Sequence, residues 1–476
     1  MKLRSKRARW FRGIRGLLFA FMAAFVASTI LISSARLVLA GPVTVKMVYW
    51  PGPESEAMAK VVDWWNKNRA DATGVKVEMV LFGREGFWEK ETTILAARSA
   101  EVDLIFTASY IVGKHAPYLD SLDEYFADPE LSKGSDLSAF IPSGLDSLKA
   151  KGKLYGIPLD ISNHFMYYRS DLIDRLLTDS DWGTKYKNLA KEYLGKELYP
   201  ADPNNWSCED WLATCIFFTK KYNPESPTTY GTALPAKNLI YNVMIWNNIL
   251  WAFGGSWFKD GFVPDINSEA GLKALKVYVD LVKYEVTPPG STTYEFPEVN
   301  EAFKTGKAAT VLQWSAAYHM LVDPKESPLI CEKTRIAPVP GVKLADGTAT
   351  HATHVHALGV GLNSVSKHKK EAFKWMAFLA SPEAMLMYAK YGGIPPVGIV
   401  LKSPKLAAEH VEYPVISKHV DAYGFVETTI PETTAILEVM SKHLSAAWAL
   451  QVDPKEALDA ANKEIYDLLK AAGYYK

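Results

Sequence analysis

Aromatic rings interleaved with amides form the chemical pattern that stands out in this sequence. The chain has 14 Trp and 24 Tyr among its 476 residues. In one stretch the rings alternate with amide side chains, at Tyr241, Asn242, Trp246, Asn247 and Trp251. Rings pack on the apolar faces of a small molecule, and amides hydrogen-bond its polar groups. These five residues are therefore candidate ligand contacts, although rings at helical spacing also fill ordinary cores.

Two further aromatic residues follow predicted strands. Residue types and alternation predict strands at 43–50, 75–81 and 102–106, with helices between them at 54–68 and 86–100. Such alternation indicates a parallel sheet with crossover helices, that is, an α/β fold. Ligands of these sheets bind beyond the carboxyl ends of the strands, where Trp50 and Tyr110 lie. Both are candidate ligand contacts.

Neither the histidines nor the known catalytic motifs indicate a metal site or an enzyme. His351, His354 and His356 are close enough in sequence to bind zinc or copper, but no acidic or thiol partner is evident nearby. We therefore expect no metal and no cofactor here, and favour contact with a ligand or entry into a strand. The sequence has no HExxH, GxSxG or CxxC motif, and its glycine-rich segments lack the spacing of a dinucleotide or phosphate loop.

Charge is distributed unevenly along the chain. The first 40 residues hold eight Lys or Arg and no acidic residue, whereas residues 41–476 carry 45 basic and 53 acidic residues, a net of −8. A mildly acidic body argues against nucleic acid as a partner. The basic start, the apolar run Leu17–Ile32 and the small-residue pattern Val38-Leu39-Ala40 predict a signal peptide, residues 1–40, cleaved before Gly41. An uncleaved N-terminal anchor is the alternative.

The remaining helices and cysteines predict packing rather than chemistry. Ser207 and Asp210 resemble a capping box that starts a helix at 208–222. Cys208 and Cys215 would then lie about 10.5 Å apart along the axis, too far for a disulfide. Two helices are expected after Pro431, the second at 454–471 behind an Asp453 cap. The tryptophans expected in the core are Trp64, Trp65, Trp211 and Trp375.

Several blocks in a fixed order together resemble a known family. The chain is similar to the extracellular solute-binding proteins of family 1, which serve ABC importers and have the maltose-binding-protein fold. Each block alone is weak, but their shared order spans nearly the whole chain after residue 41. The blocks are Gly152–Pro158, Tyr167–Leu172, Trp251–Gly255, Ala302–Ala309, Leu358–Leu362, Ser366–Ala372, Gly392–Pro396 and Asp453–Leu458.

The resemblance implies two α/β lobes joined by a hinge that the chain crosses three times. Transfer of the block positions puts the crossings near 159–162, 354–356 and 418–425. One lobe would comprise residues 41–160 and 355–420, and the other 161–354 and 421–476. The ligand would sit in the cleft between the lobes, which close on it by hinge motion.

The resemblance also implies further site residues. Trp314 stands where family members often place a ring that stacks on the ligand, with a core tryptophan as the alternative. Asp160 and His164 would flank the first hinge crossing, where they could hydrogen-bond hydroxyl groups or make only local contacts. A pyranose has apolar faces for rings and hydroxyls for such partners.

Three functions remain open at this point. The resemblance favours a non-enzymatic, exported binding protein, expected as a monomer, that delivers a mono- or oligosaccharide to an ABC permease with a cytoplasmic ATPase. A cationic ligand such as a polyamine or quaternary amine would instead require carboxylates beside the rings. An exported carbohydrate-active enzyme would require two carboxyl groups about 5–9.5 Å apart, which sequence cannot reveal.

Overall fold

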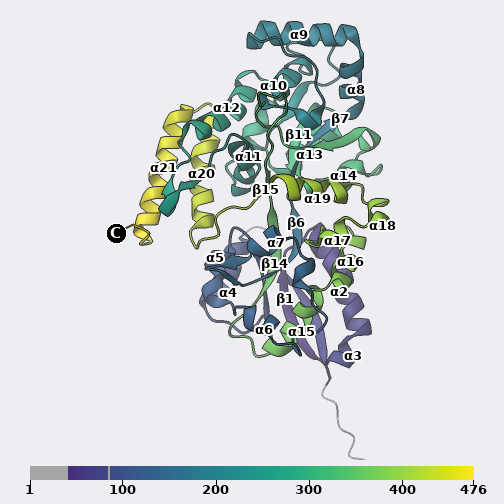
Figure 1. The fold of residues 1–476 in the computed structure, drawn as a ribbon, viewed down its shortest axis with the longest axis vertical. Helices are drawn as coiled ribbons and strands as arrows, with labels where there is room; N and C mark the ends of the chain where they lie inside the picture. Colours follow the sequence, from purple (N-terminus) through teal and green to yellow (C-terminus); the bar gives the residue numbers. More distant parts are fainter. Residues whose placement is uncertain (1–40, 84–85, 476) are drawn as a thin grey trace, which may run out of the picture. The chain divides into compact units, whose positions relative to one another are not determined.

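The structure is a computed structural model that describes residues 41–83 and 86–475 (Figure 1). The predicted signal peptide, residues 1–40, lies outside the described residues. Within the part that is described, no helix combines the length and the apolarity needed to cross a membrane.

The first sheet has five strands in the order β2-β1-β3-β14-β6. β1 (Val43–Tyr49) pairs in parallel with β2 (Val75–Leu81) and with β3 (Leu104–Ala108), as the alternation of strands and helices predicted. β14 (His356–Leu362) and β6 (Ile157–Ser162) complete the sheet in antiparallel pairings. The parallel strands are linked by α2 (Pro53–Asn68) and α4 (Phe87–Ala96).

The second sheet has four strands in the order β12-β7-β11-β8. β11 (Ala308–Trp314) pairs in parallel with β8 (Tyr230–Ala233) and antiparallel with β7 (His164–Arg169). β12 (Thr334–Ala337) forms the far edge. The helices that pack on this sheet are α10 (Cys208–Phe217), α11 (Ile240–Ala252) and α13 (Phe296–Lys304). α9 (Ser180–Leu194) packs on α10, and α12 (Glu269–Lys283) packs on α10 and α11.

The chain passes between the two sheets three times. β6 continues into β7 through Asn163 alone, and Val355 separates β13 (Thr353–His354) from β14. The third passage is β15 (Gly424–Phe425), which pairs in parallel with β13. In Figure 1, β15 lies between the group of β7 and β11 and the group of β6 and β14. Two α/β halves with three connections match the fold class that the sequence indicated.

After β14 the chain is mainly helical. α15 (Lys369–Leu379) packs against β2, and α16 (Pro382–Lys390) packs against α2. α19 (Glu412–Tyr423) leads into β15 and contacts both β13 and β15. The yellow helices of Figure 1, α20 (Thr433–Trp448) and α21 (Pro454–Ala471), pack on each other and on α12. They confirm the two predicted terminal helices, and the Asp453 side chain accepts hydrogen bonds from the first turn of α21.

Three predicted boundaries are wrong by several residues. β3 begins at Leu104 rather than Val102, because Asp103 uses its carboxylate to accept from the Lys46 N–H and the Ser366 hydroxyl. The predicted helix at 86–100 ends at Ala96, since Arg98 adopts a left-handed conformation with φ of 52°. The predicted helix at 208–222 ends at Phe217, whose carbonyl accepts from the side chain of Asn223.

The cores confirm most of the packing predictions. Trp65, Trp211 and Trp375 are buried, and Trp64 is half-buried and stacked on Phe378. The Ser207–Asp210 capping box is present at the start of α10. Cys208 and Cys215 are buried free thiols, as their spacing predicted.

Candidate ligand-binding site

Rings and histidines gather where the two sheets meet. Trp314 is the last residue of β11, and it pairs with His164, the first residue of β7. His356 begins β14 and pairs with Ser162 at the end of β6. The three residues therefore reach one place because each stands at a strand end beside a passage between the halves.

Trp314 and Tyr110 frame this place with aromatic faces. The Trp314 ring lies 4.1 Å from the His164 ring and 5.1 Å from the His356 ring, measured between centroids. Tyr110 stacks on His356 at 5.2 Å with 11° between the planes. Tyr241, on α11, meets the edge of Tyr110 at 6.3 Å. Trp314 and Tyr241 are only half-buried, so parts of both rings remain accessible.

A second pair of rings, Trp251 and Phe425, lies beside His354. Trp251, at the end of α11, lies 5.7 Å from the ring of His354. It stacks on Phe425 of β15 at 5.3 Å and 17°. Phe425 is exposed, whereas His354 is fully buried. The cluster therefore draws residues from β15 as well as from both sheets.

One buried carboxylate ties the cluster together. Glu427 lies 2.5 Å from Nε2 of His354 and accepts a 2.7 Å hydrogen bond from the Ser109 hydroxyl. Burial alone would raise the pKa of Glu427, but His354 and Ser109 outweigh burial and hold the pKa below its usual value. Glu427 is thus an ionised acceptor whose two oxygens are both engaged.

The hydrogen bonds around the histidines define which nitrogens are left for a ligand. Asn248 accepts from the backbone N–H of His354 and presents its amide nitrogen 3.0 Å from Nδ1 of His164. The neutral His164 ring is then protonated at Nε2, and Nε2 has no hydrogen-bond partner among the described residues. Nε2 of His354 faces Glu427, and Nδ1 of His354 likewise has no partner in the described part of the chain.

Two ring nitrogens without partners among the described residues, on stacked imidazoles, suit a hydroxyl group. The His164 and His354 rings lie 5.6 Å apart at 15°. Burial and the neighbouring His354 and His356 lower the pKa of His164 well below its usual value, so this ring is neutral. A hydroxyl can accept from the protonated Nε2 of His164, which a purely cationic group cannot do.

Five of the sequence candidates have other partners in this structure. Trp50 packs among Phe87, Trp88 and Phe106. Of these rings, Trp88 in turn contacts Tyr110. The buried Asp160 carboxylate accepts from the Tyr388 hydroxyl and the Ile394 N–H, at 2.7 and 2.8 Å. Burial and nearby Glu54 raise the pKa of Asp160. These contacts fasten β6 to the loop after α16.

The other three lie on α11. The Asn242 amide donates to backbone carbonyls of Lys237 and Tyr294. Trp246 is fully buried and donates to the Ala274 carbonyl, while Asn247 accepts from the Trp257 indole. Each contact explains the residue as packing within the second half, so a ligand role for these residues stays a prediction.

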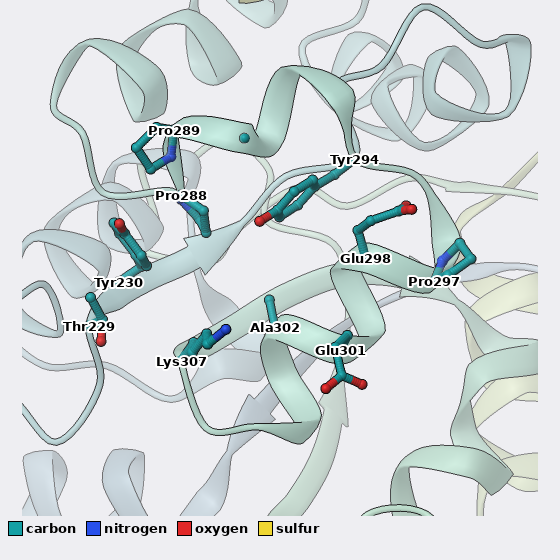
Figure 2. A pocket seen from close by; sticks show the side chains of 11 residues that line it. Thr229, Tyr230, Pro288, Pro289, Tyr294, Pro297, Glu298, Glu301, Ala302 and Lys307 are labelled. Atoms are coloured by element: carbon teal, nitrogen blue, oxygen red, sulfur yellow. The ribbon is translucent and has the colours of Figure 1, made fainter.

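A pocket of about 710 Å³ lies elsewhere, beside α13 (Figure 2). It adjoins the amino ends of β8 and β11, whereas Trp314 stands at the carboxyl end of β11, roughly 20 Å along the strand. Ligands of parallel strands bind at carboxyl ends, which favours the ring and histidine cluster. The pocket is lined by Thr229, Tyr230, Pro288, Pro289, Gly290, Tyr294, Pro297, Glu298, Glu301, Ala302 and Lys307.

Sequence reasoning missed several members of the cluster. Ser109, Asn248 and Glu427 stand close to candidate residues, but no motif marks them. His354 and His356 were considered, yet their placement beside Trp314 required the strand pairings. The hinge expected near 354–356 was the one signal that pointed to them.

Comparisons with known proteins give the family. The family model described as bacterial extracellular solute-binding protein matches residues 64–413. A probable amino-acid ABC transporter periplasmic-binding protein of Sinorhizobium fredii is 26% identical over 52% of this chain, which spans only 54% of that relative. A mannitol-binding protein of Pseudomonas aeruginosa is 25% identical over 82% of this chain and 85% of its own.

Solved structures agree on the fold. A maltose-bound MalE3 of T. maritima superposes with a TM-score of 0.71 at 23% identity, covering 89% of this chain and 99% of that chain. The family match covers most of the chain and includes the strands that carry His164, Trp314 and His356. The chain therefore belongs to the bacterial extracellular solute-binding protein family.

Proposed function

We propose that the protein captures a carbohydrate or polyol between its two halves and delivers it to an ABC importer. The observation that carries this proposal is the pair of stacked, buried imidazoles, His164 and His354, each with a ring nitrogen that lacks a partner among the described residues. Beside them stand the rings of Trp314 and Tyr110. Rings for the apolar faces and imidazoles for the hydroxyls are what a polyhydroxylated solute requires.

The proposed ligand contacts keep only some of the residues that the sequence suggested. They comprise Tyr110, His164, Tyr241, Trp251 and Trp314 from that set, joined by His354 and His356. Ser109, Asn248 and Glu427 act behind them by fixing the orientation and protonation of the imidazoles. The mannitol-binding relative, matched over most of both chains, supports a polyol or sugar as the solute.

Two other ligand classes fit the cluster less well. A cation would need a carboxylate facing it, and both oxygens of Glu427 are engaged by Ser109 and His354. The partial match to a probable amino-acid transporter component favours an amino acid, but the proposed contacts include no arginine or lysine to bind its carboxylate.

We further propose that the protein catalyses nothing. A glycosidase needs two carboxyl groups on either side of the bond that it cleaves, whereas the proposed contacts and their supports include only Glu427. The binding protein would act as a monomer and deliver its solute to two partners, a membrane permease and a cytoplasmic ATPase, which carry out the transport.

Family membership implies an exported protein. We propose that the segment before Gly41 is a signal peptide removed after Ala40, because of the basic start and the small residues before the cut. N-terminal sequencing of the exported protein should return Gly41, and a chain that still begins with Met1 would contradict cleavage.

A thermal-shift screen of the exported protein tests the ligand class. Mannitol, other polyols, mono- and oligosaccharides, polyamines and amino acids would be added in turn. A solute at about 100 times its Kd stabilises the folded state by about 2.7 kcal/mol, which raises the Tm measurably. We expect polyols or sugars to raise it. A shift confined to amines or amino acids would overturn the carbohydrate proposal.

A further inference from the structure

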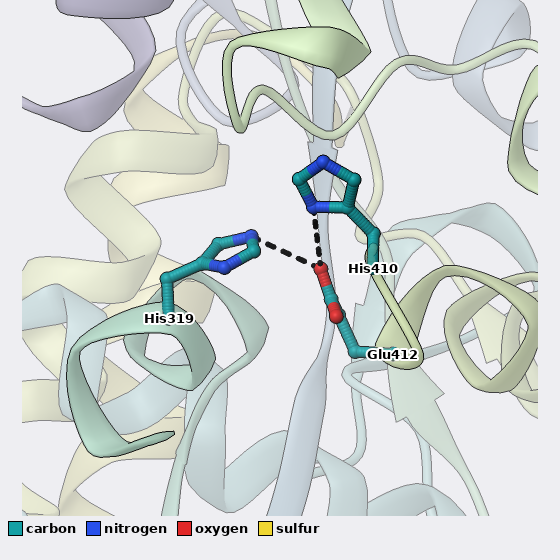
Figure 3. Close-up of side chains that lie close together, drawn as sticks. All are labelled: His319, His410 and Glu412. Carbon is teal, nitrogen blue, oxygen red and sulfur yellow. Dashed lines mark ion pairs between the residues drawn. The ribbon is translucent and has the colours of Figure 1, made fainter. Parts of the chain in front are cut away.

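Three metal-ligating side chains converge away from the proposed solute site. His319 belongs to α14 (Tyr318–Val322), His410 follows α18 (Pro404–Ala407), and Glu412 is the first residue of α19. Figure 3 shows both imidazoles turned toward one carboxylate oxygen. Within residues 41–83 and 86–475, this is the group of His, Cys, Asp or Glu side chains whose spacing suits a metal ion.

The spacing of the donor atoms suits a small transition metal. Nε2 of His319 lies 3.0 Å from Oε1 of Glu412, and Nδ1 of His410 lies 3.6 Å from the same oxygen. All three ligand atoms lie within 4.8 Å of one another. Tetrahedral zinc with bonds of about 2.0–2.2 Å separates its ligand atoms by about 3.3 Å, so only small shifts are needed.

Glu412 has a buried negative charge that nearby hydrogen bonds do not satisfy. Its side chain is 1% exposed, and neither oxygen has a hydrogen bond of good geometry among the described residues. The facing nitrogens of His319 and His410 are likewise without one. A buried carboxylate in such surroundings is costly unless a cation compensates it.

We propose that His319, His410 and Glu412 bind one divalent transition-metal ion, of which zinc fits the ligand set best. Two imidazoles and a carboxylate favour zinc over calcium or magnesium, which prefer oxygen ligands alone. The His319 side chain is 42% exposed, whereas its Nε2, Nδ1 of His410 and both oxygens of Glu412 are buried. The histidines at 351–356 contribute no ligand to this group.

The ion would connect the two halves of the protein. His319 follows β11 of the second sheet closely, through a short helical turn. His410 stacks on Tyr413 at 4.5 Å and 5°, and the Tyr413 hydroxyl bonds the carbonyls of Ala389 and Gly393 beside α16. Because α16 packs on α2, which flanks the first sheet, the ion would restrain the two halves from moving apart.

Calorimetric titration with zinc chloride, after removal of metal with a chelator, tests this site on the exported protein. We expect one zinc ion per chain for the wild type and at least a tenfold weaker affinity for His319→Ala. His319 is partly exposed, so that variant should fold, as circular dichroism would check. Glu412→Gln should lose affinity too, and Co²⁺ absorption in the visible range should change in parallel.

A matched control separates this site from ordinary histidine–carboxylate pairs. His443 lies 2.7 Å from Glu464, without a second histidine nearby, so His443→Ala should leave zinc affinity unchanged. Failure of the wild type to bind zinc would overturn the proposal. So would equal affinity in the wild type and His319→Ala, or a loss of affinity that follows His354→Ala instead.

Discussion

At the scale of single residues, histidines carry most of the unusual chemistry of this protein. His164 and His354 have nitrogens without partners in the described part of the chain, and His319 and His410 face a buried carboxylate. The sequence could single out His164 through its expected place at the hinge. It could not pair His319 with His410, because about ninety residues separate them and only the fold brings their rings to 5.1 Å from each other.

A further histidine makes stability depend on pH. Burial, aided by the neighbouring charge of Lys114, lowers the pKa of His115 from 6.5 to about 3. Between these values the unfolded chain binds a proton that the folded chain does not, so stability falls as pH drops below 6.5. The loss attributable to this group is about 1.4 kcal/mol per pH unit.

We expect His115→Leu to flatten the decline in unfolding free energy, measured with urea at pH 6.5, 5.5 and 4.5. Neither ring nitrogen of His115 has a hydrogen-bond partner among the described residues, so leucine removes no such bond. His368→Gln, at the start of α15, serves as a control for the loss of a histidine elsewhere in the chain. An unchanged slope in His115→Leu would show that the residue does not titrate as described.

At the scale of elements, alternation and spacing predicted well what local sequence determines. The strands at 43–49 and 75–81, the capping box at Ser207 and the two terminal helices follow from neighbouring residues. The start of β3 was missed because partners from afar intervene, since Asp103 accepts from Lys46 and Ser366. Periodicity has no access to such partners.

A variant of Asp160 tests whether this residue supports the fold or contacts the solute. Its carboxylate holds the Tyr388 hydroxyl and the Ile394 N–H, so Asp160→Ala leaves two buried donors unsatisfied. We expect a loss of about 2 kcal/mol or more in unfolding free energy, measured with urea, with solute affinity reduced less than threefold. A tenfold loss of affinity at full stability would instead place Asp160 in the site, as the sequence first suggested.

At the scale of the whole molecule, the site exists only because three passages bring the halves together. His164, His354 and Phe425 each stand at or beside one passage, and the carboxyl end of β11 delivers Trp314 to the same place. The resemblance to solute-binding proteins anticipated the three passages, and the ligand role that it implies for Trp314 stays a prediction. It could not anticipate that Asn242 and Trp246 bond within their own half, since rings and amides on one helix have the same spacing in either role.

The central claim is that a hydroxylated solute binds among the rings and histidines at this junction rather than in the pocket beside α13. Calorimetric titration with the best polyol or sugar from the screen, on the wild type, Trp314→Ala and Tyr294→Ala, tests it directly. Tyr294 lines the α13 pocket, so it is the matched aromatic control. We predict more than tenfold weaker binding for Trp314→Ala and unchanged binding for Tyr294→Ala, with both variants folded. Unchanged affinity in Trp314→Ala together with a loss in Tyr294→Ala would contradict the claim and move the site to the pocket.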